Sequence, residues 1–331
     1  MNPEYLSLVN TALHSDIDSP ELPGVLDRIR TQLSQGDSTS LPEGRSWSSN
    51  GILISPRAAA RCFQGGPRTV KYLRAVYRAL QHPGDGEFLD VVYPGCGPYG
   101  TLVVPLLPLF SDAKIRITFI DVHQASIDHL EKIISSMGLS RVQCRFRCMN
   151  AMDYLPENKI DLLVLECLIQ GLRDEGQVAI TTHLSPYLAQ SGRLIPRQII
   201  VRANWIDPVA ELSYVHQCRR AGADIDPLAL AQFRIPVGKL LSLDRHTHQR
   251  LDSEPAQIHL PEFRLPEKQR QGQVLGLCTT LDLDAEFRLD EYEDGITHPC
   301  YPSYSGELSP GTLLKLVYKT GSRPGFVPAS D

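Results

Sequence analysis

The stretch Val91-Val92-Tyr93-Pro94-Gly95-Cys96-Gly97-Pro98-Tyr99-Gly100-Thr101-Leu102 joins the end of an apolar run to a turn with three glycines. Residues 88–92 are typical of a buried strand. The apolar run 102–110 predicts a helix, which Pro105 and Pro108 limit to short or kinked pieces. Glycine permits a tight turn and lets a ligand approach the backbone. The stretch therefore predicts a nucleotide-sized binding loop, although such turns also serve purely structural strand–helix units.

An acidic residue follows this loop at the expected distance. Residues 115–120 predict a second strand that ends in Asp121, which lies 21 residues after Gly100. An acid in this place suits a ribose, because one carboxylate can accept hydrogen bonds from both vicinal hydroxyls. Further on, the residues Ala151, Met152 and Asp153 form a turn that we expect to contact a base.

Strands and helices alternate through the middle of the chain. We expect helices at 57–80, 123–137 and 177–190, and further strands at 142–148, 160–165 and 197–205. This alternation predicts an α/β fold with a parallel sheet. After about residue 205, short segments with proline and strand-like runs at 256–264, 273–283 and 312–319 predict a β-rich domain.

These patterns divide the chain into four parts. We expect N-terminal helices (3–14 and 20–35) with a polar linker over 1–45 and a Rossmann-like domain over 46–204. A β-rich substrate domain follows over 205–322, and a tail over 323–331. For the helices before residue 36, the sequence suggests only a packing or oligomerisation role.

Composition and charge exclude several classes of protein. The 331 residues carry a net charge of −5, so no basic surface is expected for nucleic acid or an anionic membrane. No apolar run is long enough to span a bilayer, and residues 1–16 lack a signal-peptide pattern, so we expect a cytoplasmic protein. The eight cysteines form no disulfide framework and are expected as free thiols. We expect no metal, neither at Cys144 and Cys148 nor at His246 and His248.

Two glutamates frame the loop after the fourth strand. Glu166 ends that strand, and Glu175 follows nine residues later. Two carboxylates flanking a strand-end loop can hold a cationic substrate from two sides. The alternative is that Glu175, beside Asp174, opposes the dipole of the next helix. Arg68 precedes the glycine loop by one helix and can clamp a carboxylate, although by position alone it is typical of a solvated surface arginine.

Taken in order, these residues resemble the protein arginine methyltransferases over roughly residues 50–320. The similar motifs are an Arg-Thr pair at Arg68 and Thr69, the loop from Gly95 to Gly100, the acid Asp121, a double-glutamate loop and Thr297-His298. The resemblance implies a class I methyltransferase domain followed by a C-terminal β-barrel or β-sandwich. It also implies S-adenosylmethionine as the cofactor. Cofactor binding is expected from Arg68, Gly95, Cys96, Gly97, Gly100, Asp121, Ala151, Met152 and Asp153.

The resemblance also assigns the catalytic residues. Glu166 and Glu175 are expected to orient a guanidinium, and His298 to accept or relay the released proton. Three departures from the family pattern concern the substrate more than the cofactor. Tyr93 stands where the family usually has an acid, Pro299 replaces a tryptophan, and no inserted dimerisation arm is evident.

We therefore expect N-methylation of a guanidino group on free arginine, a related metabolite or a peptide. One alternative is a small-molecule methyltransferase acting on carbon, oxygen or an amine. Another is a catalytically silent partner protein with the same fold, which Tyr93 and Pro299 favour. The expected partner is a small molecule or peptide with a guanidino or amino group, and a homodimer is a possible assembly.

Overall fold

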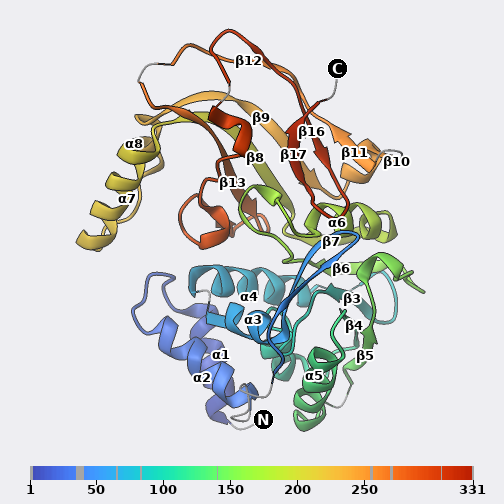
Figure 1. Ribbon diagram of the computed structural model, residues 1–331. Helices are drawn as coiled ribbons and strands as arrows, with labels where there is room; N and C mark the ends of the chain where they lie inside the picture. Colours follow the sequence, from blue (N-terminus) through green and yellow to red (C-terminus); the bar gives the residue numbers. More distant parts are fainter. Residues whose placement is uncertain are drawn as a thin grey trace.

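The computed structural model describes residues 3–34, 41–64, 66–82, 84–139, 141–253, 256–268, 271–306 and 308–329. Figure 1 shows two stacked parts, with the N-terminal half of the chain in the lower one and the C-terminal β-strands in the upper one. The described helices include none that is both long and apolar enough to cross a bilayer.

The lower part is built on a five-stranded sheet. Its strands are β3 (Leu89–Pro94), β4 (Ile115–Asp121), β5 (Gln143–Cys148), β6 (Ile160–Val164) and β7 (Leu188–Ile195), in the order β5-β4-β3-β6-β7. Every neighbouring pair is parallel. The sheet therefore confirms the predicted Rossmann-like α/β fold. Since the carboxyl ends of parallel strands share one edge, the residues that follow β3, β4 and β6 are brought together.

Helices pack around this sheet. They are α1 (Pro3–His14), α2 (Leu22–Ser34), α3 (Pro56–Arg61), α4 (Gly66–Leu80), α5 (Gln124–Ser136) and α6 (Gln177–Leu184). The apolar face predicted for the second helix is buried at Leu22, Val25, Leu26, Ile29 and Leu33. The expected helix over 57–80 is divided by a 3-10 turn, η1 (Cys62–Gln64). The first and second helices are thus confirmed, and the third is interrupted.

Two segments of the lower part differ from expectation. The apolar run after the glycine loop forms a 3-10 helix, η2 (Val104–Phe110), because Pro105 and Pro108 cannot donate the hydrogen bonds of a regular α-helix. The helix expected to reach residue 190 ends at Leu184, and β7 begins after the 3-10 turn η5 (Ser185–Tyr187). The fifth parallel strand was therefore missed. It is an edge strand whose centre, Gln190-Ser191-Gly192, lacks an apolar run.

The upper part consists of antiparallel sheets. One has the order β14-β13-β8-β9, with β8 (Gln198–Ile206), β9 (Arg234–Asp244), β13 (Val274–Asp282) and β14 (Arg288–Leu289). The other has the order β10-β11-β16-β17, with β10 (Leu251–Ser253), β11 (Ala256–His259), β16 (Leu316–Lys319) and β17 (Gly325–Pro328). A short ribbon pairs β12 (Phe263–Arg264) with β15 (Leu313–Leu314). The predicted β-rich C-terminal domain is confirmed. β7 belongs to the parallel sheet and β8 to an antiparallel sheet. The chain therefore passes from one sheet to the other before the domain boundary that we expect after residue 204.

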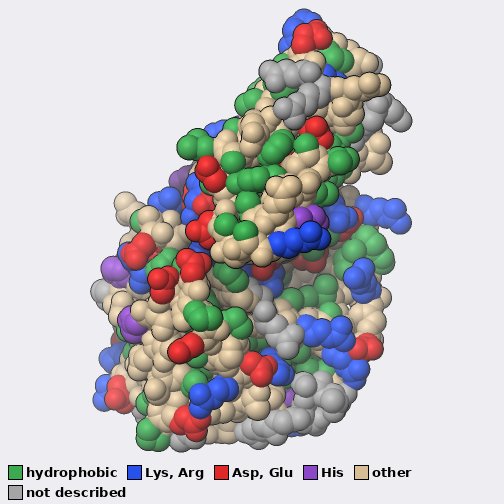
Figure 2. Space-filling view, turned by 90° about the vertical axis from the view of Figure 1, so that its left-hand side faces the viewer, with side chains coloured by type: hydrophobic (Ala, Val, Ile, Leu, Met, Phe, Trp, Pro, Cys, Tyr) green, Lys and Arg blue, Asp and Glu red, His purple; other side chains and the backbone are tan. Residues whose placement is uncertain are grey.

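Two helices between β8 and β9 were not expected. They are α7 (Pro208–Ala221) and α8 (Pro227–Ala231), each preceded by an aspartate whose side chain accepts a backbone N–H of the first turn. An Asp-Pro pair is a helix-start signal, since aspartate caps the first turn and proline suits its first position. In Figure 1 both helices project to one side of the upper part, and in Figure 2 apolar side chains gather over that part. Val209 and Leu228, on these helices, are 80% and 83% exposed.

Candidate functional site

The glycine loop adopts a backbone that requires glycine at three positions. Gly95, Gly97 and Gly100 have φ values of 64°, 61° and 53°. In this left-handed region a side chain is strained. A Cβ atom at Gly95 would also lie 2.5 Å from the Cys167 sulfur, and one at Gly100 would lie 2.4 Å from Val104. The loop is therefore fixed both by its conformation and by its packing.

Asp121 ties this loop to the end of β4. Its Oδ2 accepts the Gly97 N–H at 3.0 Å, and its Oδ1 accepts the His123 N–H at 2.9 Å. The side chain is buried, and burial raises the pKa of Asp121 although these two backbone N–H groups oppose the shift. Each carboxylate oxygen keeps one acceptor position beyond its backbone partner. Asp121 thus has acceptor capacity left at the pocket described next.

A pocket of about 110 Å³ lies at the carboxyl edge of the parallel sheet. Of the residues in the sequence prediction, Gly95, Asp121, Ala151, Glu166 and Glu175 line it. Its other lining residues are Ser48, Asn50, Ile52, Leu53, Ile54, Ala59, Ile120, Val122, His123, Ser126, Met149, Asn150, Cys167, Gly176 and Ile180. Ligand pockets for drug-sized molecules usually measure about 300–1,000 Å³. The pocket in this conformation is therefore smaller than a nucleotide-sized ligand requires.

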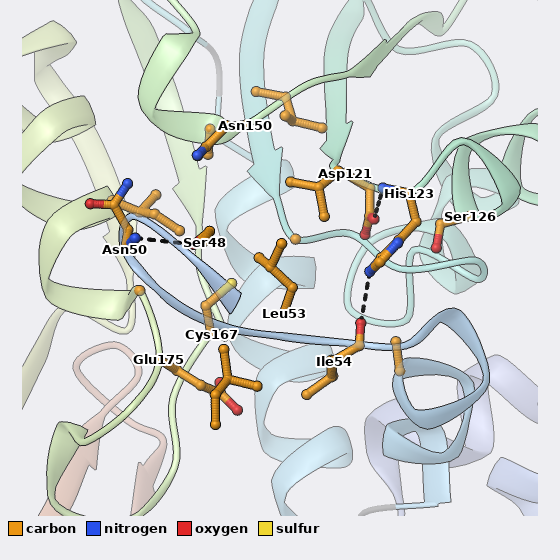
Figure 3. Close-up of a pocket in the computed structure, with 18 of the residues that line it drawn as sticks. Ser48, Asn50, Leu53, Ile54, Asp121, His123, Ser126, Asn150, Cys167 and Glu175 are labelled. Carbon is orange, nitrogen blue, oxygen red and sulfur yellow. Dashed lines mark hydrogen bonds between the residues drawn. The ribbon is translucent and has the colours of Figure 1, made fainter. Parts of the chain in front are cut away.

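A β-hairpin accounts for the small volume. Its strands are β1 (Arg45–Ser48) and β2 (Gly51–Ile54), and Figure 3 shows Leu53 pointing into the middle of the pocket. The Ile52 N–H donates to the Asp174 carbonyl at 2.7 Å, and the His123 ring Nε2 lies 3.1 Å from the Ile54 carbonyl. We call this hairpin the strap, residues 45–54. It joins the glutamate loop to the end of β4 and covers the pocket between them.

Glu166 is engaged by Arg68. The Arg68 Nη1 lies 3.2 Å from Glu166 Oε1 and 3.6 Å from Asp294 Oδ1, and Nη2 donates to the Cys62 carbonyl at 3.4 Å. Burial by itself lowers the pKa of Arg68, but Glu166 and Asp294 raise it above its ordinary value. Burial raises the pKa of Glu166, and the Arg68 guanidinium opposes that shift. Arg68 does not line the pocket and stands behind Glu166.

Glu175 lines the same pocket without an ion pair or a hydrogen bond to its carboxylate among the described contacts. Burial and then the charge of Glu166 raise the pKa of Glu175 to about 8, while Arg68 opposes the shift. The two glutamates therefore converge on one pocket in different states. Glu166 is paired with the Arg68 guanidinium, whereas Glu175 has no cationic partner among the described residues and a pKa of about 8.

The loop between the glutamates is strained and is held by the upper part. Gly171, Leu172 and Asp174 have positive φ values of 66°, 53° and 61°. For leucine this conformation is rare, and such strain is typical of functional loops. The Tyr318 hydroxyl donates to the Leu172 carbonyl at 2.6 Å, and the Asp174 N–H donates to the Pro324 carbonyl at 2.8 Å. The C-terminal strands thus set the position of Glu175.

His298 is placed apart from the pocket. It follows the 3-10 turn η7 (Gly295–Thr297), and its Nε2 lies 3.1 Å from Arg219 Nη2. Burial and the Arg219 guanidinium lower its pKa. His298 does not line the pocket, and no described contact joins it to Glu166 or Glu175. Asp294, which caps η7, is the residue that links this turn to Arg68.

The remaining predicted residues divide into two groups. Ala151 lines the pocket, at the start of the 3-10 turn η3 (Ala151–Asp153), whereas Met152 packs into the apolar cluster beside the sheet and Asp153 lies outside the lining. Cys96, Gly97 and Gly100 lie in the loop but do not line the pocket.

Sequence reasoning missed the strap, His123 and Ser126. Asn50-Gly51 between strand-like residues is a standard hairpin signal and could have revealed the strap. Ser126 is fully buried, and its hydroxyl has no partner among the described residues although it lines the pocket. A buried hydroxyl without a hydrogen-bond partner lowers the stability of the fold, so Ser126 is typical of a residue whose partner is a bound ligand. No sequence signal marks it.

The fold and site together define a Rossmann-like α/β domain with a strand-end pocket, joined to antiparallel sheets. No family model matches the chain, and no curated protein matches it. Three solved structures are similar to it: the Trypanosoma brucei PRMT1 enzyme–prozyme complex with AdoHcy, Arabidopsis thaliana protein arginine methyltransferase 10, and PRMT6.

The similarity to these structures is low. The sequence identities are 13%, 12% and 14%, and the TM-scores are 0.47, 0.45 and 0.44. The matches cover 76%, 76% and 78% of this chain and 84%, 84% and 92% of the other chains. Scores at this level do not establish a family, so the function proposed below rests on the geometry of the site.

Proposed function

We propose that this protein is an S-adenosylmethionine-dependent methyltransferase whose acceptor is a guanidino group on a small molecule or peptide. The observation that supports it most is the meeting of Asp121, Glu166 and Glu175 in one pocket beside Gly95. One carboxylate suits vicinal hydroxyls, and the other two suit a delocalised cation.

The donor set of the pocket fits the proposed cofactor. Asp121 has acceptor capacity for ribose hydroxyls, and the unpartnered Ser126 hydroxyl can donate or accept. Ile120, Met149 and Ala151 supply apolar contacts suited to a base. Arg68 stands outside the lining, behind Glu166, and its five N–H donors exceed the partners it now has, so it can reach a ligand carboxylate only if its contact with Glu166 shifts.

S-adenosylmethionine supplies an electrophilic methyl group on a sulfonium sulfur. The protein's residues then have to hold and polarise the acceptor, because a guanidinium is protonated near neutral pH and is a poor nucleophile. Glu166 and Glu175 draw the positive charge of the guanidinium toward the nitrogens they bind. A bound cation lowers the pKa of Glu175, so binding releases the proton that this carboxyl holds.

Glu175 is also the better-placed acceptor for the proton that methylation releases. It lines the pocket, and the proton it gives up when the cation binds leaves it able to accept another. His298 has neither a described contact to the pocket nor a raised pKa. We therefore assign the proton to Glu175 and keep a relay through His298 as the weaker proposal.

The pH dependence of stability tests the state of Glu175. A carboxyl whose pKa is higher in the folded than in the unfolded protein stabilises the fold below its unfolded value, near 4.5, and loses that contribution as pH rises to about 8. Glu175→Gln is expected to match the unchanged protein near pH 4 and to exceed its free energy of unfolding by about 3 kcal/mol near pH 9. Denaturant unfolding at both pH values measures this. Glu157→Gln, an exposed control, should show no such difference, and equal stabilities at high pH would refute the raised pKa.

The strap gives a second test within the pocket. Leu53 fills space that a nucleotide-sized ligand needs, so Leu53→Ala is expected to strengthen binding of S-adenosylhomocysteine about threefold to tenfold by reducing the side chain that has to be displaced. Calorimetric titration measures the dissociation constant. Leu155→Ala removes an exposed leucine outside the pocket and serves as the control. Weaker binding by Leu53→Ala would mean that Leu53 contacts the ligand and does not exclude it.

The decisive experiment is transfer of a labelled methyl group. The protein with labelled S-adenosylmethionine is offered free arginine, an arginine-rich peptide, and primary amines of similar size. Labelling of the guanidino compounds alone supports the proposal, and the absence of S-adenosylhomocysteine binding by calorimetry would overturn it entirely.

Two other functions have a specific observation in their favour. The pKa of Glu175 near 8 suits a general base, which favours methylation of a neutral amine, hydroxyl or carbon acid. The Arg68–Glu166 ion pair occupies one of the two carboxylates, which favours a silent protein of the same fold. Label on the amines supports the first, and cofactor binding without label on any acceptor supports the second.

A further inference from the structure

A second cavity, of about 710 Å³, lies between the two parts of the molecule and shares no lining residue with the candidate site. We call it the waist groove. Its walls come from α4 and β7 of the lower part, from the start of β8, and from the segments that follow β9 and β13. Its lining residues are Ala75, Arg78, Ala79, His82, Gly192, Arg193, Leu194, Ile195, Arg197, Gln198, Asp244, Arg245, His246, Leu283, Asp284 and Ala285. The volume lies within the usual range of small-molecule sites.

The charged side chains of the waist groove are mostly cationic. Four arginines and two histidines face two aspartates. Arg78 has carboxylate partners, Asp284 at 3.3 Å and Glu286. For Arg193, Arg197 and Arg245, the described residues provide no carboxylate partner at all. Three guanidinium groups from three segments therefore converge with their charge uncompensated.

The aspartates of the groove are otherwise engaged. Asp244 accepts the His246 N–H at 2.9 Å and the Ser242 hydroxyl at 3.4 Å. Asp284 accepts the N–H groups of Glu286 and Phe287 at 2.7 Å and pairs with Arg78. Neither compensates Arg193 or Arg197. Since a groove with low-dielectric walls focuses the field of its charges, this arrangement favours an anion with more than one negative charge.

The arginines differ in how much of their binding capacity is free. Arg245 donates hydrogen bonds from both Nη atoms to the carbonyls of Ala189, Gln190 and Gly192. It therefore holds β7 in place and contributes its positive charge to the groove. Among the described residues, Arg193 has one hydrogen-bond partner, the Ala79 carbonyl at 3.4 Å. Arg197 is exposed, and the described residues offer its side chain no partner. Arg193 and Arg197 are thus the residues able to bind a ligand with paired N–H donors.

We propose that the waist groove binds a phosphate-bearing small molecule of nucleotide size, with its phosphates on Arg193 and Arg197. Ala285 is exposed on the wall and Leu194 is partly accessible, and these apolar side chains suit the uncharged portion of such a ligand. This site is independent of the function proposed for the strand-end pocket.

The test uses the full chain with two probes, inorganic pyrophosphate and ADP, in calorimetric titrations at constant ionic strength. Arg193→Gln and Arg197→Gln are each expected to weaken both probes about tenfold, since a charge-assisted hydrogen bond contributes that much or more. Arg147→Gln is the matched control, because Arg147 is exposed on β5 and its only hydrogen-bond partner among the described residues is the carbonyl of Phe146. The Arg147→Gln variant should bind both probes with the affinity of the unchanged protein.

Three outcomes would overturn the proposal. The first is that neither probe binds. The second is that the Arg193→Gln, Arg197→Gln double variant binds as well as the control. The third is that saturating S-adenosylhomocysteine displaces the probes competitively, since that would place them in the strand-end pocket. Arg197 makes no described side-chain contact, so its variant is expected to keep the unfolding midpoint of the unchanged protein, which a denaturant titration confirms.

Discussion

Replacing Asp121 with alanine is expected to weaken binding of S-adenosylhomocysteine by about a hundredfold or more, because the two hydrogen bonds that its carboxyl group accepts from the ribose hydroxyls are lost. The carboxylate also holds the glycine loop through Gly97 and the end of β4 through His123. The variant therefore loses about 2 kcal/mol of unfolding free energy as well, since two backbone N–H groups lose their acceptor. Calorimetric titration and denaturant unfolding separate the two effects.

The chain offers a close control for this experiment. Asp161 on β6 is as buried as Asp121, and it too accepts two backbone N–H groups, those of Asp85 and Asp90. It lies outside the lining of the pocket. Asp161→Ala should lose similar stability and keep full binding. If both variants lost the same affinity, Asp121 would affect binding only by stabilising the fold, and the proposal that it contacts the ribose would be wrong.

Replacing Glu166 with glutamine is expected to reduce methyl transfer about 100- to 1,000-fold while S-adenosylhomocysteine still binds. Glutamine keeps the shape of the side chain but removes the charge that polarises a guanidinium. The change also breaks the ion pair with Arg68, which retains Asp294 at 3.6 Å. Single-turnover transfer to the acceptor found by labelling measures the rate, and titration measures cofactor binding.

Glu211 provides the matched control for Glu166. It is fully buried on α7 and pairs with Arg234 through both oxygens, at 2.6 and 2.8 Å. It is no part of the pocket lining. Glu211→Gln should lower stability by breaking a buried ion pair and leave the transfer rate unchanged. A Glu166→Gln variant with normal turnover would remove the guanidino acceptor from the proposal and leave the cofactor assignment in place.

The sequence predicted the site best at residues that directly follow a clearly patterned strand. The apolar run before Gly95 and the β-branched run before Asp121 each have a single plausible structure, and parallel pairing then places their ends together. Glu166 was predicted at the same edge of the sheet because it follows the apolar strand β6. The missed elements had weaker local patterns. β7 is an edge strand with a polar centre, and in a β-rich region the Asp-Pro starts of α7 and α8 resemble breaks between strands.

The partners of the charged side chains could not be predicted. Arg68 lies on α4 and Glu166 follows β6, so their ion pair exists only once the lower part has folded, and the pair of Arg68 with Asp294 exists only once the upper part has packed against it. The raised pKa of Glu175 depends in the same way on burial by segments far apart in the chain. The unsatisfied hydroxyl of Ser126 is also invisible to any local pattern.

The C-terminal segments hydrogen-bond the loop between Glu166 and Glu175, and this has a consequence for folding during biosynthesis. Leu172 and Asp174 are bonded by Tyr318 and Pro324, which the ribosome adds some 150 residues later. Because early segments of a nascent chain fold first, the parallel sheet can form while this loop still lacks the hydrogen bonds from Tyr318 and Pro324. A nascent or prematurely terminated chain is therefore expected to have the sheet while two of the hydrogen bonds that hold the loop before Glu175 are still missing.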